Sequence, residues 1–123
     1  GGSWGAMLGG YNYALDAAAQ LVQVPANAIA GGITFDYQML SYDSRVVPHD
    51  YLTFKILDSH AQPLQIVPIA NNTDANYLWT HVTSPDLSGY RGQSVFVHFE
   101  CQTDSSLTTS FVIDNVSFLV LVP

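Results

Sequence analysis

The stretch "GITFDYQML", residues 32–40, decides the fold class. Apolar and polar side chains alternate along it, and a period of two is typical of a β-strand that buries one face. The same alternation recurs in "YLTFKILD" (51–58) and "SVFVHFEC" (94–101). The three segments predict an all-β protein whose sheets each bury one face. The positions predicted to face the core are Ile33, Phe35, Tyr37 and Met39, then Leu52, Phe54 and Ile56, then Val95, Val97, Phe99 and Cys101.

The segment Ser110–Val122 is longer and apolar on both faces, so we expect a central strand with a neighbour on each side. Pro68, inside a short apolar run, marks an edge strand or a bulge. The alanine-rich run 14–21 is too short to predict a helix with any force. Further short strand candidates are "QLVQV" (20–24), "LQIVPI" (64–69) and "YLWTHVT" (77–83).

Seven or eight short strands separated by polar turns predict an antiparallel β-sandwich. The chain has 123 residues, which is the length of one ordinary domain, and no repeat or linker divides it. We therefore expect a single domain over residues 1–123, with Gly1–Ser3 as a linker or a remnant of cloning. The start of the chain lacks the pattern of a signal peptide, so the sequence is typical of a module from a longer chain or of a mature, processed protein.

The charge balance excludes two classes of partner. Ten acidic residues face three basic ones, for a formal net charge of −7. Binding to nucleic acid or to an anionic membrane surface needs clustered Lys and Arg, whereas Arg45, Lys55 and Arg91 are scattered. No apolar run approaches the roughly 18 residues that span a bilayer. We expect neither a nucleic-acid nor a membrane partner.

The order of motifs along the chain resembles a known domain. The motifs are "LGGYN", "ITFDYQM", "DYLTFKILD", "DLSGYRGQSVFVHFE" and a closing "TDSSLTTSFVIDNVSF", and they cover roughly Trp4 to Phe118. They resemble the jelly-roll accessory domain at the C-terminal end of secreted sedolisin-type and subtilisin-type peptidases. More distantly, they resemble MAM-like and carbohydrate-binding-module-like jelly rolls that end in "IDDVSL". Here Asn115 stands where the family usually has a second Asp.

The resemblance implies a jelly-roll sandwich that is secreted and non-catalytic. Such a module would help to fold or anchor a neighbouring enzyme, or would bind polymeric substrate. Jelly rolls of this type often hold a structural calcium ion near the strand ends. The Asn at position 115 weakens the case for a metal at the last strand, because it removes a negative charge there.

The calcium hypothesis rests on aspartates in loops. Calcium takes six to eight oxygen ligands from carboxylates, carbonyls and water. Asp43 and Asp50 bracket one loop, and Asp104 lies in another. In a jelly roll these two loops lie at the same end, so Asp50 and Asp104 would share a Ca²⁺ ion, with Asp43 and Asp114 as further candidates. The alternative is that these residues are ordinary turn and cap aspartates.

Asp114 poses a separate question because it lies within an apolar run. The chain between Asp104 and Asp114 would span roughly 33 Å if fully extended. Asp114 is therefore expected to meet N-terminal groups around Asn12 or Asp16, to bind a second cation, or to cap backbone donors locally.

The sequence offers no recognisable catalytic constellation. The four histidines do not form a closely spaced pair, and no G-x-S-x-G elbow occurs. Glu100 is the one glutamate, on an outward-facing position, and Cys101 alternates with apolar residues and is expected to pack as one. We expect no enzyme.

An aromatic run offers a candidate ligand-binding strip. Tyr77, Trp79 and His81 alternate on one face of a short strand and, if exposed, would stack on sugar rings. We favour the alternative in which Trp79 fills the core while Leu78 and Val82 face outward, or in which a neighbouring domain covers the strip. N-glycosylation sequons occur at Asn71 and Asn115; the latter lies in a buried-looking strand and is read as accidental.

Three functions follow from these observations. The first is a non-catalytic extracellular accessory module, stabilised by calcium, that supports neighbouring domains of a larger secreted protein. The second is a carbohydrate-binding module that holds a polysaccharide on its aromatic strip. The third is a self-assembling surface or filament subunit, suggested by low charge content and the apolar run "FLVLV" (118–122).

Overall fold

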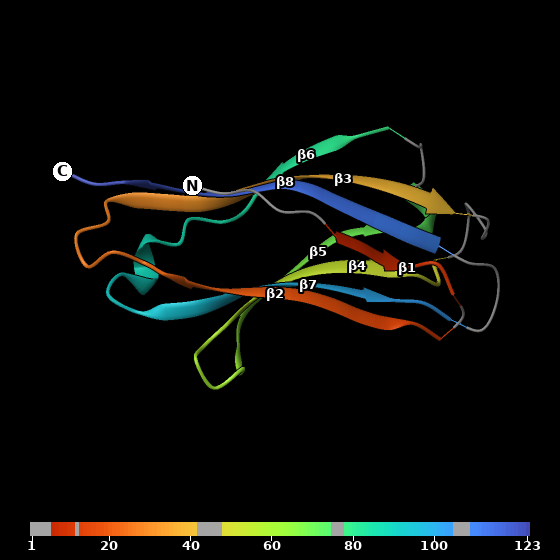
Figure 1. Ribbon diagram of the computed structural model, residues 1–123, viewed down its shortest axis with the longest axis horizontal. Helices are drawn as coiled ribbons and strands as arrows, with labels where there is room; N and C mark the ends of the chain where they lie inside the picture. Colours follow the sequence, from red (N-terminus) through yellow and green to blue (C-terminus); the bar gives the residue numbers. More distant parts are fainter. Residues whose placement is uncertain (1–5, 12, 42–47, 75–77, 105–108) are drawn as a thin grey trace.

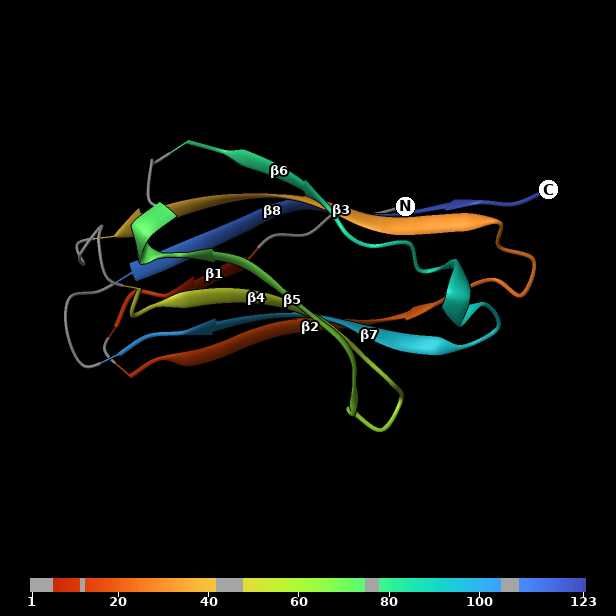
Figure 2. The ribbon, with the colours of Figure 1, turned by 180° about the vertical axis from the view of Figure 1, so that it is seen from behind.

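A computed structural model describes residues 6–11, 13–41, 48–74, 78–104 and 109–123, and the statements below concern these residues. They form two antiparallel four-stranded sheets packed face to face, as Figures 1 and 2 show from opposite sides. The strands are β1 (Ala6–Gly9), β2 (Leu15–Gln23), β3 (Ala30–Ser41), β4 (Tyr51–Leu57), β5 (Pro63–Asn71), β6 (Thr80–Thr83), β7 (Ser94–Gln102) and β8 (Thr109–Leu121), with single 3-10 turns η1 (Asn72–Asp74) and η2 (Ser88–Tyr90).

The strand order identifies the type of sandwich. Sheet A has the order β1-β8-β3-β6 and sheet B the order β2-β7-β4-β5. Strand β1 therefore pairs with β8, β2 with β7, β3 with β6 and β4 with β5, all antiparallel. This nested pairing is the wrapping of a jelly roll. The predicted antiparallel jelly-roll sandwich is confirmed.

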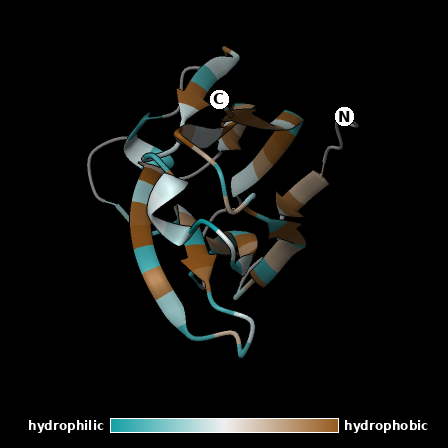
Figure 3. Ribbon diagram, turned by 90° about the vertical axis from the view of Figure 1, so that its left-hand side faces the viewer, coloured by the Kyte–Doolittle hydropathy of each residue, from teal (hydrophilic) through white to brown (hydrophobic). Residues whose placement is uncertain are grey.

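The core lies between the sheets and is centred on three aromatic rings. Phe35 of sheet A meets Phe99 of sheet B edge-to-face at 4.8 Å between ring centroids, and Phe54 lies 5.4 Å from Phe99. Such geometries are the favoured ones for aromatic pairs. Figure 3 shows apolar and polar bands alternating along the strands. The alternation predicted from the sequence is confirmed: all of the predicted core positions are buried except Tyr37, which is partly buried against the core.

Strand β8 is the predicted central strand, between β1 and β3. A β-bulge interrupts its pairing with β3, where the single residue Phe35 faces two residues of β8, Asn115 and Val116. Asn115 adopts a left-handed conformation (φ 53°), which asparagine tolerates better than most residues. The bulge lets Val116 turn inward while Asp114 and Asn115 are both exposed.

Two strands were harder to foresee. All of the run 14–21 except Ala14 lies in β2, which pairs with β7 over nine residues, because tertiary pairing overrides the helix propensity of alanine. Strand β1 is only four residues long and carries too little pattern to be recognised. Pro68 lies in the edge strand β5 beside a register shift, as expected. Within the described residues, no helix is long and apolar enough to cross a bilayer.

Candidate functional site

Three polar side chains meet on the outer face of sheet A. Asp36 of β3 has its Oδ1 at 2.7 Å from Nδ1 of His81 on β6, and its Oδ2 accepts a hydrogen bond of 2.9 Å from Nδ2 of Asn115 on β8. Both carboxylate oxygens are therefore held, and each partner comes from a neighbouring strand. We call this set the Asp36 group.

The local fold explains why these side chains face outward. Val82 pairs with the fully buried Phe35 and packs against the core, so its strand neighbour His81 points to the opposite face. Asp36 follows Phe35 and is turned outward by the same alternation. Asn115 reaches the outer face through the bulge in β8.

Trp79 comes just before β6, the strand that carries His81 of the Asp36 group, and its exposure corrects a prediction. Its side chain is 52% exposed, two residues before His81, so the interpretation that it fills the core is wrong. The pairing of β6 with β3 turns Val82 inward instead, although Leu78 is exposed as expected (67%). Tyr77, the third residue of the predicted strip, lies outside the described residues.

Asp114 shares this face but plays a local part. Its Oδ1 accepts a hydrogen bond of 2.8 Å from the backbone N–H of Asn115, which confirms the predicted local cap of a backbone donor. It lies opposite Asp36 in the strand register, in the middle of β8 and not at its end. Of the N-terminal groups that Asp114 was predicted to meet, Asn12 lies outside the described residues, and Asp16 instead accepts hydrogen bonds from the N–H of Gly9 and the hydroxyl of Tyr11.

The formal charges that the described residues place on the outer face of sheet A are negative. Asp36 and Asp114 are both carboxylates, whereas the two basic residues in the described part of the chain lie elsewhere. Lys55 pairs with Glu100 of sheet B at 2.8 Å, and Arg91 follows η2 and donates from Nε to the carbonyl of Ala28. The sequence alone could not show that Asp36 and Asp114 share a face without Lys55 or Arg91, because cross-strand neighbours are set by the register of the strands and not by spacing along the chain.

The Asp36 group carries a prediction about titration. Hydrogen bonds from Asn115 and then His81 lower the pKa of the Asp36 carboxyl below its usual range. Asn115→Ala removes the larger cause, so the Asp36 pKa is expected to rise toward its ordinary value, as measured by NMR titration of the side-chain carboxyl carbon. A lowered pKa means that Asp36 stabilises the fold above its unfolded-state pKa, and that this contribution is lost as pH falls through the folded-state pKa. An unchanged Asp36 titration in the variant would contradict the pairing.

A second polar cluster lies at one end of the sandwich, on the right in Figure 1. Asp50, at the start of β4, is fully buried. Its Oδ1 accepts a 3.0 Å hydrogen bond from the N–H of Asp104, and its Oδ2 accepts one from the hydroxyl of Thr109. The Thr109 hydroxyl also lies 2.8 Å from that of Ser41. The ends of β3, β4, β7 and β8 thus meet around one carboxylate.

Asn72 extends this cluster to β5. Its Oδ1 accepts hydrogen bonds from the backbone N–H groups of His49 (2.6 Å) and Asp50 (3.0 Å), and its own N–H donates to the Asp50 carbonyl. The side chain of His49 in turn lies 3.0 Å from Oδ2 of Asp104. A buried polar group is costly unless it is hydrogen-bonded, and here Asp50 and Asn72 meet that condition.

The groups around Asp50 can be compared with the oxygen ligands that a calcium ion requires. Asp50 and Asp104 are brought together as predicted, but through the Asp104 backbone N–H, a donor that calcium does not bind. No group of three or more His, Cys, Asp or Glu side chains arranged to hold a metal occurs within the described residues. Asp43 lies outside them. The described contacts of Asp50 fit a carboxylate held by hydrogen bonds better than a carboxylate that ligates calcium. The binding of a calcium ion here stays a prediction.

Cys101 lies next to this end and behaves as an apolar residue. It is fully buried in the core, as the alternation predicted. Burial, and then the nearby charges of Asp16 and Asp50, raise the pKa of its thiol to about 12. The side chain therefore stays a thiol at physiological pH, and thiolate chemistry is disfavoured.

Comparison with known proteins places the chain in no family. No protein-family description matches it, and no curated protein matches it. One solved structure that it resembles is that of infectious bursal disease virus, Gx strain, with 8% sequence identity and a TM-score of 0.34. The match covers 91% of this chain and 32% of that chain. A likeness at this level carries no argument about function.

Proposed function

We propose that this jelly roll is a non-catalytic module of a secreted protein and that it binds a carbohydrate on the outer face of sheet A. The observation that carries the proposal is the 52% exposure of Trp79, two residues before His81 of the Asp36 group. An exposed indole offers a flat apolar surface to a sugar ring, and carboxylate, imidazole and amide groups exchange hydrogen bonds with hydroxyls. Attachment to neighbouring domains follows from the resemblance to peptidase accessory domains.

The arrangement of the Asp36 group supports binding over a purely structural role. Its members come from three adjacent strands, spaced roughly 4.8 Å apart, and they hold one another by hydrogen bonds. His81 is 64% exposed and the Asp36 side chain 25%, so the group is accessible while being ordered. Side chains fixed before binding lose less conformational entropy when a ligand arrives.

Removing the indole tests the proposal. Trp79→Ala is expected to weaken binding to a soluble polysaccharide at least tenfold, a loss of about 1.4 kcal/mol, because ring stacking is lost. Affinity gel electrophoresis against a panel of plant and microbial polysaccharides measures this. Tyr51→Ala is the matched control, because Tyr51 is an aromatic residue of sheet B with 43% exposure. A wild-type protein that binds no member of the panel, or a Trp79 variant that binds as well as wild type, would sink the proposal.

A further inference from the structure

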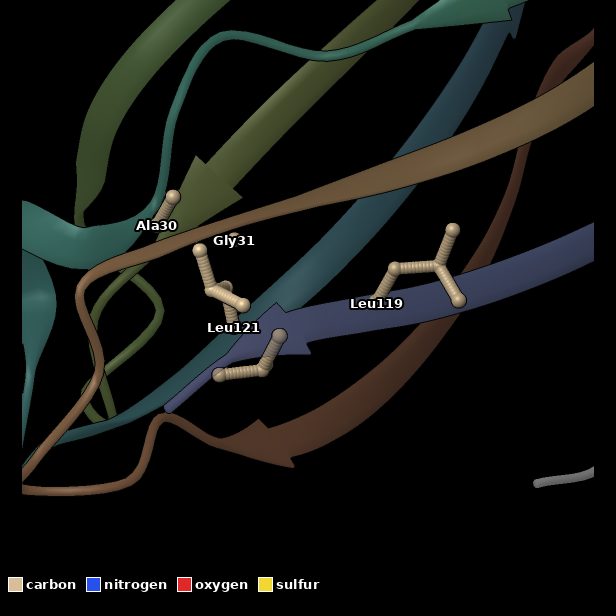
Figure 4. A pocket seen from close by; sticks show the side chains of 5 residues that line it. Ala30, Gly31, Leu119 and Leu121 are labelled. Atoms are coloured by element: carbon tan, nitrogen blue, oxygen red, sulfur yellow. The ribbon is translucent and has the colours of Figure 1, made fainter. Parts of the chain in front are cut away.

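The outer face of sheet A continues beyond the Asp36 group as an apolar surface. Leu119 and Leu121 are each 61% exposed, because Val120 between them packs against the core. With Ala30 and Gly31 of the paired strand β3, these residues line a shallow hollow of about 340 Å³. Figure 4 shows the two leucine side chains over the joined ends of β3 and β8. We call this the leucine hollow.

The leucine hollow and Trp79 lie toward opposite ends of one strand, β3. Thr80, next to Trp79, pairs with Tyr37 of β3, whereas Gly31 pairs with Val120 at the other end of that strand. The stretch of β3 between these two pairs is roughly 20 Å long. The Asp36 group lies between the two regions. A single sugar ring is much shorter than this face, whereas an extended chain of several sugars matches it.

The charges of the surface select among polysaccharides. No charged side chain occurs in Ala30–Phe35 or in Asn115–Val122, and a carboxylate reaches the leucine hollow from another segment, because Oδ1 of Asp86 accepts a 3.0 Å hydrogen bond from the N–H of Gly31. Asp36 and Asp114 add negative charge to the centre of the face, and the whole chain carries −7. An acidic polysaccharide would be repelled, and an uncharged chain would not.

We propose, building on the carbohydrate-binding function above, that the ligand is an extended, uncharged polysaccharide lying along β3 and β8. Trp79 and the Asp36 group contact one part of the chain, and the leucine hollow contacts a more distant part. Pyranose rings present apolar C–H faces, which pack on leucine side chains as they do on an indole. The affinity therefore grows with the length of the oligosaccharide until both regions are covered.

A length series separates the two regions. The probes are a disaccharide and a hexasaccharide of the neutral polysaccharide that the wild-type protein binds best, measured by isothermal titration calorimetry. Leu119→Ser is expected to weaken the hexasaccharide about fivefold, the equivalent of about 1 kcal/mol of buried apolar contact, and to leave the disaccharide unchanged. Trp79→Ala weakens both. Ile66→Ser, at a 58% exposed position of β5 in sheet B, is the matched control and changes neither.

The outcomes distinguish this inference from the proposed function. If no polysaccharide binds, the proposed function fails and this inference with it. If polysaccharide binds but Leu119→Ser affects both lengths equally or neither, only the inference about the leucine hollow is overturned. Alginate binding as tightly as the neutral chain at low salt overturns the charge selection. A dimer that Leu119→Ser dissociates, with hexasaccharide binding unchanged, would assign the hollow to a second copy of the chain and overturn the inference.

Discussion

Asp50→Ala is expected to lower the free energy of unfolding by about 3 kcal/mol or more. The substitution leaves two donors, the partly buried Asp104 N–H and the buried Thr109 hydroxyl, without their carboxylate acceptor. Each buried polar group left unsatisfied costs about 1–3 kcal/mol, and hydrogen bonds to charged acceptors lie at the upper end. Equilibrium unfolding in urea, read by tryptophan fluorescence and circular dichroism, measures the loss.

Asp74→Ala is the control for this effect. Asp74 is exposed and accepts a hydrogen bond from the N–H of Asn71, so its loss is expected to cost far less.

The same unfolding measurement, repeated with and without calcium, tests the calcium prediction. If Asp50 and Asp104 share a calcium ion, free calcium at 100 times its dissociation constant adds about 2.7 kcal/mol to the wild type and nothing to Asp50→Ala. Coincident wild-type melts in calcium and in EDTA would contradict the calcium prediction, and a neutral Asp50→Ala would contradict the role of the hydrogen bonds.

Gly9→Ala is expected to destabilise the fold by about 2 kcal/mol or more. Gly9 has φ 81°, a conformation that costs a residue with a Cβ about 1–2 kcal/mol. The added methyl group would also collide with the carbonyl oxygen of Thr109 and lie 2.9 Å from Sγ of Cys101, both of which are buried. Relief of the collision requires the Thr109 backbone and the Cys101 side chain to shift within the packed interior, which lowers the free energy of unfolding. Thermal and urea unfolding measure the loss.

Gly89→Ala provides a matched comparison for Gly9→Ala. A Cβ at Gly89, in η2, meets no atom within 4 Å, and its φ is not in the left-handed region. This substitution is expected to leave the unfolding midpoint almost unchanged. Equal losses in the two variants would show that the constraint at Gly9 comes from neither its backbone conformation nor its neighbours.

The fold could be predicted because its main signal is local. Residues such as Ile33, Phe54 and Val97 alternate with polar neighbours, and burial of one face of a strand needs no knowledge of its partner. The nested strand order, in contrast, entered only through the resemblance to a known family. Spacing along the chain does not state which strands pair.

The site could be predicted only in part. Trp79 and His81 were recognised as a candidate strip because they alternate along the chain. Whether their face was buried depended on the pairing of Val82 with Phe35, which the sequence does not state. Asp36 and Asn115 were missed because they join His81 from other strands. The sequence predicts that Asn115 lies in a buried strand, whereas it is exposed. The prediction is wrong because no sequence pattern indicates the bulge.

The bulge in β8 has a consequence for how the protein can change over time. Before it, Phe111 and Ile113 point inward; after it, Val116, Phe118 and Val120 do, so the inward side passes from odd to even positions. Deleting Asn115 would restore a continuous alternation and leave the same side chains inward, because the even positions after the bulge would become odd. Asn115 is therefore an extra residue that the bulge accommodates without disturbing the buried face of β8. A single insertion of this kind adds a polar group to the surface, here the amide that reaches Asp36, while the core contacts stay the same.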